Sequence, residues 1–206
     1  MTVHARTPRI VLASSNSGKL REYREMAAGT GIKVDLLVNF HDVPEFDETA
    51  PTFAENAVGK ALHYSRFSPE LVLADDSGLV VPALGGAPGV RSARYAGPGA
   101  TEMDRYRKLL HEMEGREGHE RDARFVCVIA AAQRGKSLLV VSDQAEGLLT
   151  AEPFGERGFG YDPIFFFPQL GRTYAELSAV EKNTYSHRGK AFRKALKFLA
   201  GPISTL

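Results

Sequence analysis

The predicted fold is built around Leu73–Leu79, which reads LADDSGL. Two adjacent carboxylates, Asp75 and Asp76, close an apolar run, and small residues follow. Such a run is typical of a buried strand that delivers its acids to the edge of an α/β sheet, where ligands bind. Side chains alternate along a strand, so only one of the two acids can face a given ligand. We expect this to be Asp76, because it lies nearer the turn that Ser77–Gly78 predicts.

Other segments extend this strand into a sheet. The sequence predicts strands over residues 10–13, 32–38, 71–75, 123–133, 137–144 and 164–167, and a loop over 41–51. It predicts helices after residue 19, over 53–67, after 101 and over 186–199. Capping-box spacing at Thr52 and Thr101 marks two of the helix starts. Strands and helices alternate early and two strands are adjacent in the middle, which predicts an α/β fold with a mixed sheet flanked by helices.

Composition limits the class of protein. The 206 residues are 43% hydrophobic, which is enough for one domain, residues 1–206, built as one body or as two lobes. A net charge of +1 argues against general binding to nucleic acid or membrane. No segment has the length of a membrane span, and the first residues lack the apolar core of a signal peptide. The single Cys127 lies in an apolar run, so we expect a buried thiol and a cytoplasmic location.

Charge is distributed unevenly along the chain. One segment carries acids without intervening Lys or Arg, namely Asp42, Glu45, Asp47, Glu48 and Glu55. Another is basic, namely Lys182, Arg188, Lys190, Arg193, Lys194 and Lys197. The first composition suits a divalent cation and the second suits phosphate.

A polar turn joins the first predicted strand to the first predicted helix. Its residues are Ser14, Ser15, Asn16, Ser17, Gly18 and Lys19. Backbone N–H groups, hydroxyls and an ammonium at a helix start can bind a phosphate. The spacing is not that of a Walker motif, and an ordinary helix cap is the alternative interpretation.

The acidic pair suggests a metal site. Mg²⁺ accepts one or two protein carboxylates and completes its shell with water and phosphate oxygens. Asp76 with an acid from Asp47–Glu48 would suffice, and ionised Asp76 could also accept a proton from an attacking water. The alternative is that these acids cap turns or pair with arginines.

Two further segments carry groups suited to a nucleobase. The turn at 158–163 contains Phe159, Gly160, Tyr161 and Asp162, whose rings can stack and whose carboxylate can accept a ring N–H. Lys182, His187 and Arg188 precede or begin the last predicted helix and can donate to a carbonyl or phosphate. For the turn at 158–163, the alternative is that its rings face the core. For His187 and Arg188, the alternative is an ordinary pair of surface residues.

Seven motifs, taken in order, resemble those of the inosine/xanthosine triphosphate pyrophosphatases. They lie at 15–19, 53–57, 74–79, 84–89, 92–95, 158–163 and 186–189. The resemblance extends from about Ile10 to Leu199 and is specific as an ordered set.

This resemblance implies a fold and an activity. The fold would be an elongated mixed sheet with two lobes and a central substrate cleft, in a homodimer. The activity would be Mg²⁺-dependent hydrolysis of non-canonical purine nucleoside triphosphates (ITP, dITP, XTP) to the monophosphate and pyrophosphate.

The resemblance also implies residue roles. Asp76 would be the proton acceptor and a metal ligand, Glu48 a second metal-associated acid and Ser77 a substrate contact. The triphosphate would bind to Ser14–Lys19 and Lys182, and the base to Phe159–Asp162, His187 and Arg188.

The sequence also suggests a basis for selecting the base. Arg188 can only donate and ionised Asp162 can only accept, which would favour a 6-oxo purine over adenine. Two alternatives stay open: a pyrophosphatase for methylated or pyrimidine nucleotides, and a nucleotide-binding regulator without turnover.

Overall fold

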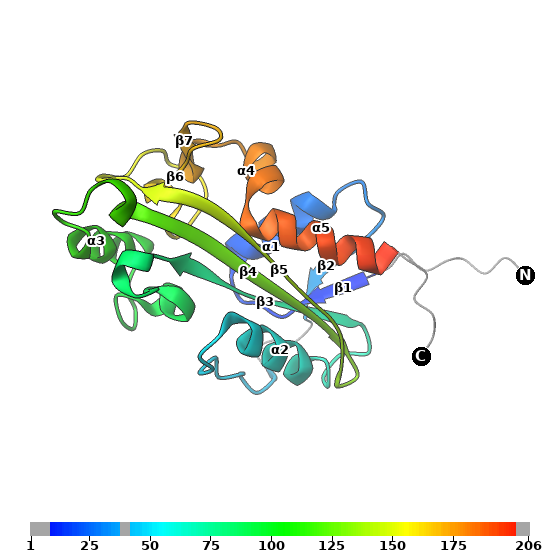
Figure 1. Ribbon diagram of the computed structural model, residues 1–206. Helices are drawn as coiled ribbons and strands as arrows, with labels where there is room; N and C mark the ends of the chain where they lie inside the picture. Colours follow the sequence, from blue (N-terminus) through cyan, green and yellow to red (C-terminus); the bar gives the residue numbers. More distant parts are fainter. Residues whose placement is uncertain (1–8, 38–41, 201–206) are drawn as a thin grey trace, which may run out of the picture. The chain divides into compact units, whose positions relative to one another are not determined.

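The computed structural model describes residues 9–37 and 42–200 of an α/β protein (Figure 1). The strands in these ranges are β1 Arg9–Leu12, β2 Lys33–Leu36, β3 Leu71–Val80, β4 Asp122–Gln133, β5 Lys136–Leu149, β6 Phe165–Phe167 and β7 Arg172–Thr173. The helices are α1 Ser17–Ala27, α2 Phe53–Tyr64, α3 Glu102–Glu112, α4 Ala179–Tyr185 and α5 His187–Ala200. Val38 and His41, which belong to the predicted strand 32–38 and loop 41–51, lie outside the described residues.

The described strands form one sheet in the order β2-β1-β3-β4-β5-β6-β7. β1 pairs in parallel with β2, where Ile10 lies opposite Val34, and in parallel with β3. β6 pairs antiparallel with β5 and with β7. The predicted mixed sheet in an α/β fold is therefore confirmed.

The chain divides into two compact units. Unit 1 comprises Met1–Asp76, Val128–Val141 and Phe192–Leu206, and unit 2 comprises Ser77–Cys127 and Ser142–Ala191. Strands β3, β4 and β5 each contribute residues to both units. The central substrate cleft stays a prediction.

The course of β3 differs from the prediction. We expected the strand to end at Asp75 and a turn at Ser77–Gly78, but β3 continues to Val80. Both acids therefore lie within the strand rather than at its end. Gly78 is required for a packing reason, because a Cβ there would lie 2.4 Å from Ser92 Oγ and 2.5 Å from the Gly89 carbonyl oxygen.

Unit 1 places helices on both faces of its strands. Val72 and Ala74 of β3 are buried against Ala57 and Ala61 of α2 in one apolar cluster. Figure 1 shows α5 on the opposite side of the strands from α2. On that side the rings of Tyr23 in α1 and Phe192 in α5 pack edge to face, with centroids 4.9 Å apart. Leu20, Tyr23 and Ala27 of α1 are buried or half-buried, as their spacing predicts.

Unit 2 has its own apolar core. Leu109 and Met113, from α3 and the residue after it, are fully buried with Phe165 of β6 and Tyr174. The start of α3 carries the predicted capping box, in which Thr101 Oγ1 accepts from the Asp104 backbone N–H.

Several element bounds differ from the sequence predictions. α2 ends at Tyr64 rather than near residue 67. Pro69 follows shortly afterwards, and the residue before a proline, here Ser68, avoids the helical region. α4 was not predicted, although Ser178 and Glu181 form a capping box at its start. Arg134 and Gly135 join β4 to β5, so β5 begins at Lys136, one residue earlier than predicted. β5 also runs on to Leu149, beyond the predicted end at residue 144.

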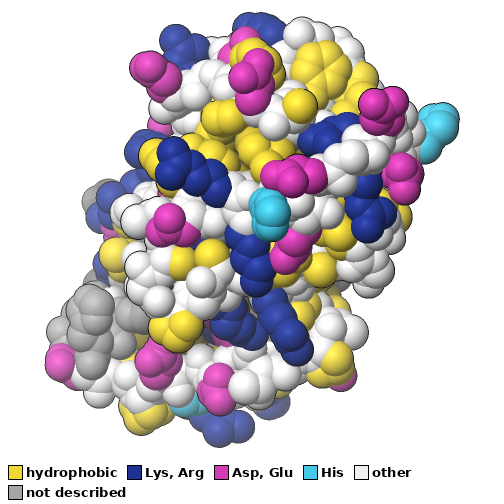
Figure 2. Space-filling model, turned by 90° about the vertical axis from the view of Figure 1, so that its left-hand side faces the viewer, with side chains coloured by type: hydrophobic (Ala, Val, Ile, Leu, Met, Phe, Trp, Pro, Cys, Tyr) yellow, Lys and Arg dark blue, Asp and Glu magenta, His cyan; other side chains and the backbone are white. Residues whose placement is uncertain are grey.

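The surface agrees with the near-neutral composition. On the face in Figure 2, Lys and Arg side chains alternate with Asp and Glu rather than forming a field of one sign. Cys127 is fully buried, as expected. Among the residues that the structure describes, no helix combines the length and apolar character needed to span a bilayer.

Candidate active site

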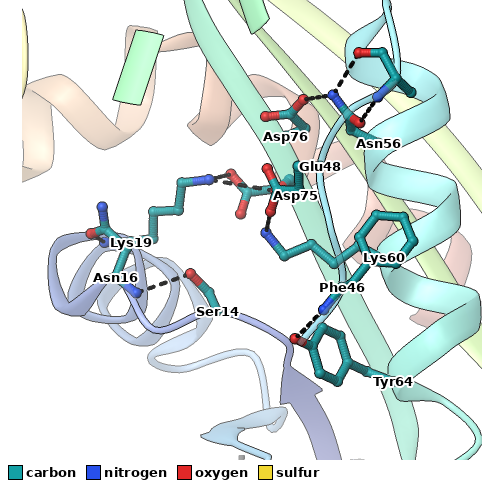
Figure 3. Close-up of polar contacts among 11 residues, drawn as sticks. Ser14, Asn16, Lys19, Phe46, Glu48, Asn56, Lys60, Tyr64, Asp75 and Asp76 are labelled. Carbon is teal, nitrogen blue, oxygen red and sulfur yellow. Dashed lines mark hydrogen bonds and ion pairs between the residues drawn. The ribbon is translucent and has the colours of Figure 1, made fainter. Parts of the chain in front are cut away.

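Asp76 is the last residue of the first segment of unit 1 and faces α2 (Figure 3). It is 6% exposed, and its Oδ2 accepts a 3.0 Å hydrogen bond from Asn56 Nδ2. The Asn56 amide is fixed in turn by the backbone of Ala50, which donates to Oδ1 and accepts from Nδ2. The Asp76 carboxylate is therefore held in a defined orientation by a side chain from the neighbouring helix.

The Asp76 carboxyl has a perturbed pKa. Its pKa is raised to about 6 from the ordinary 3.8, mainly by burial and also by the charges of Glu48 and Asp75. The Asn56 hydrogen bond and the Lys19 charge act in the opposite direction. A group with this pKa is ionised at neutral pH, yet it is basic enough to accept a proton from water during a reaction.

Asp75 faces the other way. It is fully buried, and its Oδ2 lies 3.0 Å from Nζ of Lys19 near the start of α1. The two acids thus bind groups from different helices, as the alternation of a strand predicts. Asp75 positions the Lys19 ammonium, whereas Asp76 is presented towards α2 and the 42–52 loop.

The polar turn that precedes α1 is a helix cap. Asn16 is the N-cap residue, and its Oδ1 accepts a 3.0 Å bond from the Lys19 backbone N–H. Ser14 Oγ accepts from the Asn16 N–H. The capping interpretation is therefore confirmed, and a phosphate role for the same turn stays a prediction. The other residues of the turn are exposed or half-buried, namely Ser15, Ser17 and Gly18.

Lys60 adds a cation to this cluster. It lies four residues after Asn56 on α2, which places both on one helix face, and its Nζ forms an ion pair with Glu48 Oε1. Burial alone would lower the pKa of Lys60, but the Glu48 charge, with those of Asp75 and Asp76, raises it above its ordinary value. Lys60 therefore stays protonated beside three carboxylates.

The donor set fits a magnesium ion that is shared with a substrate. Within residues 9–37 and 42–200, no group of three or more His, Cys, Asp or Glu side chains is arranged to hold a metal by itself. Mg²⁺ needs only one or two carboxylates when phosphates supply the rest. The pKa of Asp76, raised by burial and by Glu48, shows that its negative charge is disfavoured there, and a nearby cation would relieve this.

A second cluster lies in unit 2 around Asp162. Asp162 Oδ2 accepts from the Phe159 backbone N–H at 2.7 Å and lies 2.5 Å from Lys182 Nζ. Both members of this ion pair are buried, and the Lys182 ammonium lies 4.7 Å from the centroid of the Phe159 ring. Gly158, with φ +78°, leaves room for the carboxylate, which a Cβ would meet at 2.1 Å. The structure thus groups Lys182 with the aromatic turn.

Arg188 and His187 begin α5 beside this cluster. Arg188 Nη2 donates to Ser77 Oγ at 2.8 Å, and its guanidinium carbon lies 5.4 Å from the Phe159 ring centroid. The His187 ring stacks on Phe125 at 4.6 Å, and His187 is 3% exposed. Phe159, Lys182, Arg188 and Ser77 are therefore linked by direct contacts, while His187 is buried against a core aromatic ring.

The two aromatic residues of the turn have different environments. Tyr161 is buried in the unit 2 core, and its hydroxyl donates to the Ser92 carbonyl oxygen at 2.9 Å. Burial raises its pKa. Phe159 and Gly160 are half-buried. The alternative of a core-facing ring therefore holds for Tyr161, whereas the Phe159 ring remains near the surface.

Sequence reasoning did not identify Asn56 and Lys60 as site residues. Asn56 belongs to one of the motifs that carry the resemblance, and its spacing from Lys60 places both on the face of α2 that meets β3. Helical periodicity measured from Asn56 could have found Lys60. The contact with Asp76 depends on the pairing of distant segments.

Comparisons with known proteins identify relatives of this chain. The model of the Ham1 family matches residues 10–198. A curated dITP/XTP pyrophosphatase from Geobacillus kaustophilus is 49% identical over 185 residues, which cover 90% of this chain and 91% of that protein. Another dITP/XTP pyrophosphatase, from Desulforamulus reducens, is 45% identical, and the match covers 93% of this chain and 95% of that protein.

Solved structures give the same result. A HAM1 protein from Coxiella burnetii superposes with a TM-score of 0.83 at 44% identity, covering 93% of this chain and 98% of its own. The Ham1 protein of Staphylococcus aureus superposes with a TM-score of 0.82 at 37% identity. The match covers 94% of this chain and 98% of the Staphylococcus aureus chain. Because the family model spans nearly the whole chain and the relatives are this similar, the chain belongs to the Ham1 family.

Proposed function

We propose that this protein hydrolyses non-canonical purine nucleoside triphosphates, the class that includes dITP, ITP and XTP, to the monophosphate and pyrophosphate. The family match over residues 10–198, with relatives at 45–49% identity named dITP/XTP pyrophosphatases, carries this conclusion. The geometry supports it through a buried, oriented carboxylate beside two lysines and a second acid.

Asp76 is assigned the role of proton acceptor. A water oxygen attacks the α-phosphorus, the bond from that phosphorus to the bridging oxygen breaks, and pyrophosphate leaves. The water proton passes to the Asp76 carboxylate, whose pKa of about 6 suits this transfer near neutral pH. The Asn56 amide keeps the accepting oxygen in place.

Two lysines are assigned to the phosphates. Lys19, held by Asp75, and Lys60, held by Glu48, bring positive charge to the region of Asp76, and both ammonium groups are largely buried. Stabilisation of phosphate charge dominates phosphoryl transfer. Lys60 is added to the cations assigned to the phosphates. The phosphate role of Lys182, which the resemblance implies, stays a prediction.

Mg²⁺ is the proposed cofactor, with Asp76 and Glu48 as the residues that hold it. When bound, it would neutralise phosphate charge and polarise the α-phosphate. Glu48 is positioned by its ion pair with Lys60.

The unit 2 cluster is assigned to the base. The Phe159 ring offers a stacking face, and Arg188 and Lys182 offer donors to a 6-oxo group. Adenine carries a donor at that position, so neither cation could donate a hydrogen bond to it. Asp162 acts mainly as the anchor of the turn, since its Oδ2 is occupied by Phe159 N–H and Lys182.

A substrate panel tests this proposal. Pyrophosphate release would be measured for dITP, XTP, dATP, dGTP, a methylated purine triphosphate and dCTP, each with and without Mg²⁺. We expect release from dITP and XTP that needs the metal and greatly exceeds release from dATP. A preference for the methylated or pyrimidine substrate would favour the first alternative, and binding without release would favour a regulator.

We further propose a homodimer in the cytoplasm. The dimer follows from the family resemblance, and the location follows from a nucleotide-pool substrate. Sedimentation equilibrium checks the dimer, and a mass of 22.5 kDa across a wide concentration range would exclude it.

A further inference from the structure

Unit 1 contains a hollow at the C-terminal end of α2. Its volume is about 530 Å³, and its lining residues are Ser65, Arg66, Phe67, Ser68, Pro69 and Arg134. Asn56, which binds Asp76, lies nine residues before Ser65, or ~14 Å along the helix at 1.5 Å per residue. The hollow is therefore separate from the Asp76 cluster.

Hydrogen bonds fix the walls of this hollow. The Gly135 N–H donates to Ser65 Oγ at 3.0 Å and ties the β4–β5 turn to the end of α2. Gln133 Nε2 donates to the Pro69 carbonyl oxygen at 2.9 Å, which ties β4 to the segment before β3. The hollow thus has a defined frame built from three sequence-distant segments.

The charge of the hollow is positive and unneutralised. Arg66 and Arg134 line it, no carboxylate does, and neither guanidinium makes a hydrogen bond or ion pair with any residue of the described ranges. A Cβ built on Gly135 would lie 3.9 Å from Arg66 Nε, so the Arg66 side chain passes beside the turn that carries Arg134. Two guanidiniums without a protein partner are suited to bidentate binding of a phosphate.

Helix capping does not explain Arg66. The last carbonyl oxygens of α2, at 61–64, accept from the Ser65 N–H and Oγ and from the N–H groups of Arg66 and Phe67. These groups are the ones that a basic side chain at a helix end would otherwise satisfy. The guanidinium is left for another acceptor.

Backbone conformation points the same way for Arg134. Its φ is +52°, in the left-handed region, and that of Gly135 is +76°. Asn and Gly normally occupy both central positions of such a two-residue hairpin turn, because other residues are disfavoured there. An arginine that tolerates this conformation indicates that its side chain is used.

We propose that this hollow binds a small phosphate-bearing anion, either inorganic pyrophosphate or the phosphate of a nucleoside monophosphate. Arg66 and Arg134 pair with the phosphate oxygens, and the Phe67 ring, 48% exposed, offers a stacking face to a base if one is attached. The choice of these two ligands rests on the proposed function, because both are its products. The anion site itself does not depend on turnover.

The test is an NMR titration of the ¹⁵N-labelled full chain without divalent cations, using inorganic pyrophosphate and inosine monophosphate separately. We expect saturable shifts of the Phe67 and Gly135 amide signals. In the variant R66Q/R134G these shifts should need at least tenfold more ligand, while the signals of Asn56 and Lys19 respond as in wild type. Replacing Arg134 with glycine suits the turn, so the variant should fold.

The matched control R91Q/R107Q removes two exposed arginines of unit 2 and should titrate like wild type. The variant F67L separates the ligands: selective weakening of monophosphate binding supports a nucleotide, and unchanged binding of both supports pyrophosphate. Absence of saturable shifts at Phe67 and Gly135 in wild type, or wild-type titration of R66Q/R134G, would overturn the proposal. Failure of the proposed function would instead appear as lack of turnover with these shifts intact.

Discussion

The Asp76 side chain carries the chemistry at the scale of single residues. Replacing it with asparagine preserves the shape and an oxygen for Asn56, but it removes the proton acceptor and a metal-associated charge. We expect D76N to lower kcat for dITP by about 10²–10⁴-fold. Circular dichroism should stay unchanged, and D35N, which alters a carboxylate that pairs with Arg9 and Lys33 away from this cluster, should keep full activity. Near wild-type turnover in D76N would remove Asp76 from the mechanism.

The same residue should make stability depend on pH. The folded-state pKa of Asp76 is raised to about 6, so its contribution to stability is fully present below the unfolded value near 3.8 and is lost as pH rises through 6. We therefore expect metal-free D76N to be more stable than wild type at pH 8, by about 1–3 kcal/mol, because the folded-state pKa lies well above the unfolded one. The difference should vanish below pH 4. Urea unfolding across this range measures it.

Glu181 provides a control of opposite sign. Hydrogen bonds from the Ser178 backbone, and from the Arg172 and Ser178 side chains, lower its pKa to about 2. Its contribution to stability is present above the unfolded value near 4.5 and is lost as pH falls through 2. E181Q should therefore be less stable than wild type at neutral pH, and the two should converge in acid. The same direction of effect in E181Q and D76N at pH 8 would contradict one of the two assignments.

The sequence identified the residue types of the site better than their partners. Asp76, Lys19, Phe159 and Arg188 were proposed because acids, glycine-flanked aromatics and basic helix starts have recognisable patterns, and their roles stay predictions. Lys60 was missed because its importance comes from Glu48, twelve positions earlier in a loop, and sequence patterns do not show which loop folds back.

At the scale of elements, β3 organises the site. It brings Asp75 to α1 and Asp76 to α2 and then continues as Ser77–Gly78, where Gly78 allows the 89–92 segment to approach. We expect G78A to destabilise the protein by about 1–3 kcal/mol, because a Cβ would meet both a side chain and a backbone carbonyl oxygen. Chemical denaturation measures this change.

The double variant G78A/S92A sharpens this prediction. Removing the Ser92 hydroxyl relieves the 2.4 Å contact but leaves the 2.5 Å contact with the Gly89 carbonyl oxygen. It also deletes the acceptor of the Leu79 N–H. Stability should therefore stay below wild type. Full recovery of stability in the double variant would show that the contact with the Gly89 carbonyl oxygen does not cause the destabilisation.

Element prediction succeeded where local signals suffice. The capping residues Thr52 and Thr101 predicted two helix starts correctly, and apolar periodicity predicted the buried face of α1. The end of β3 was predicted wrongly because Ser-Gly is a turn signal in isolation. Here the Ser92 hydroxyl accepts from the Leu79 N–H, and the strand continues. Long-range contacts overrode local preference.

At the scale of the whole molecule, the two units should contribute separately to rate and selectivity. We expect K60M in unit 1 to lower kcat/KM for dITP and dATP by similar factors, since both share the triphosphate. R188Q in unit 2 should lower the dITP/dATP ratio at least tenfold, the scale expected when a hydrogen-bonding partner of the base is removed. Steady-state kinetics with both substrates measures these ratios. Equal effects of R188Q on both nucleotides would contradict its assignment to the base.

The burial of Cys127 has a practical consequence for the whole chain. This single thiol is fully covered in the middle of β4, where unit 2 gives way to a unit 1 segment. An alkylating reagent can reach it only when the strand opens locally. The rate at which iodoacetamide alkylates the thiol therefore measures local opening of the sheet without any engineered label. Slower capture in the presence of nucleotide would give a direct readout of how substrate tightens the protein.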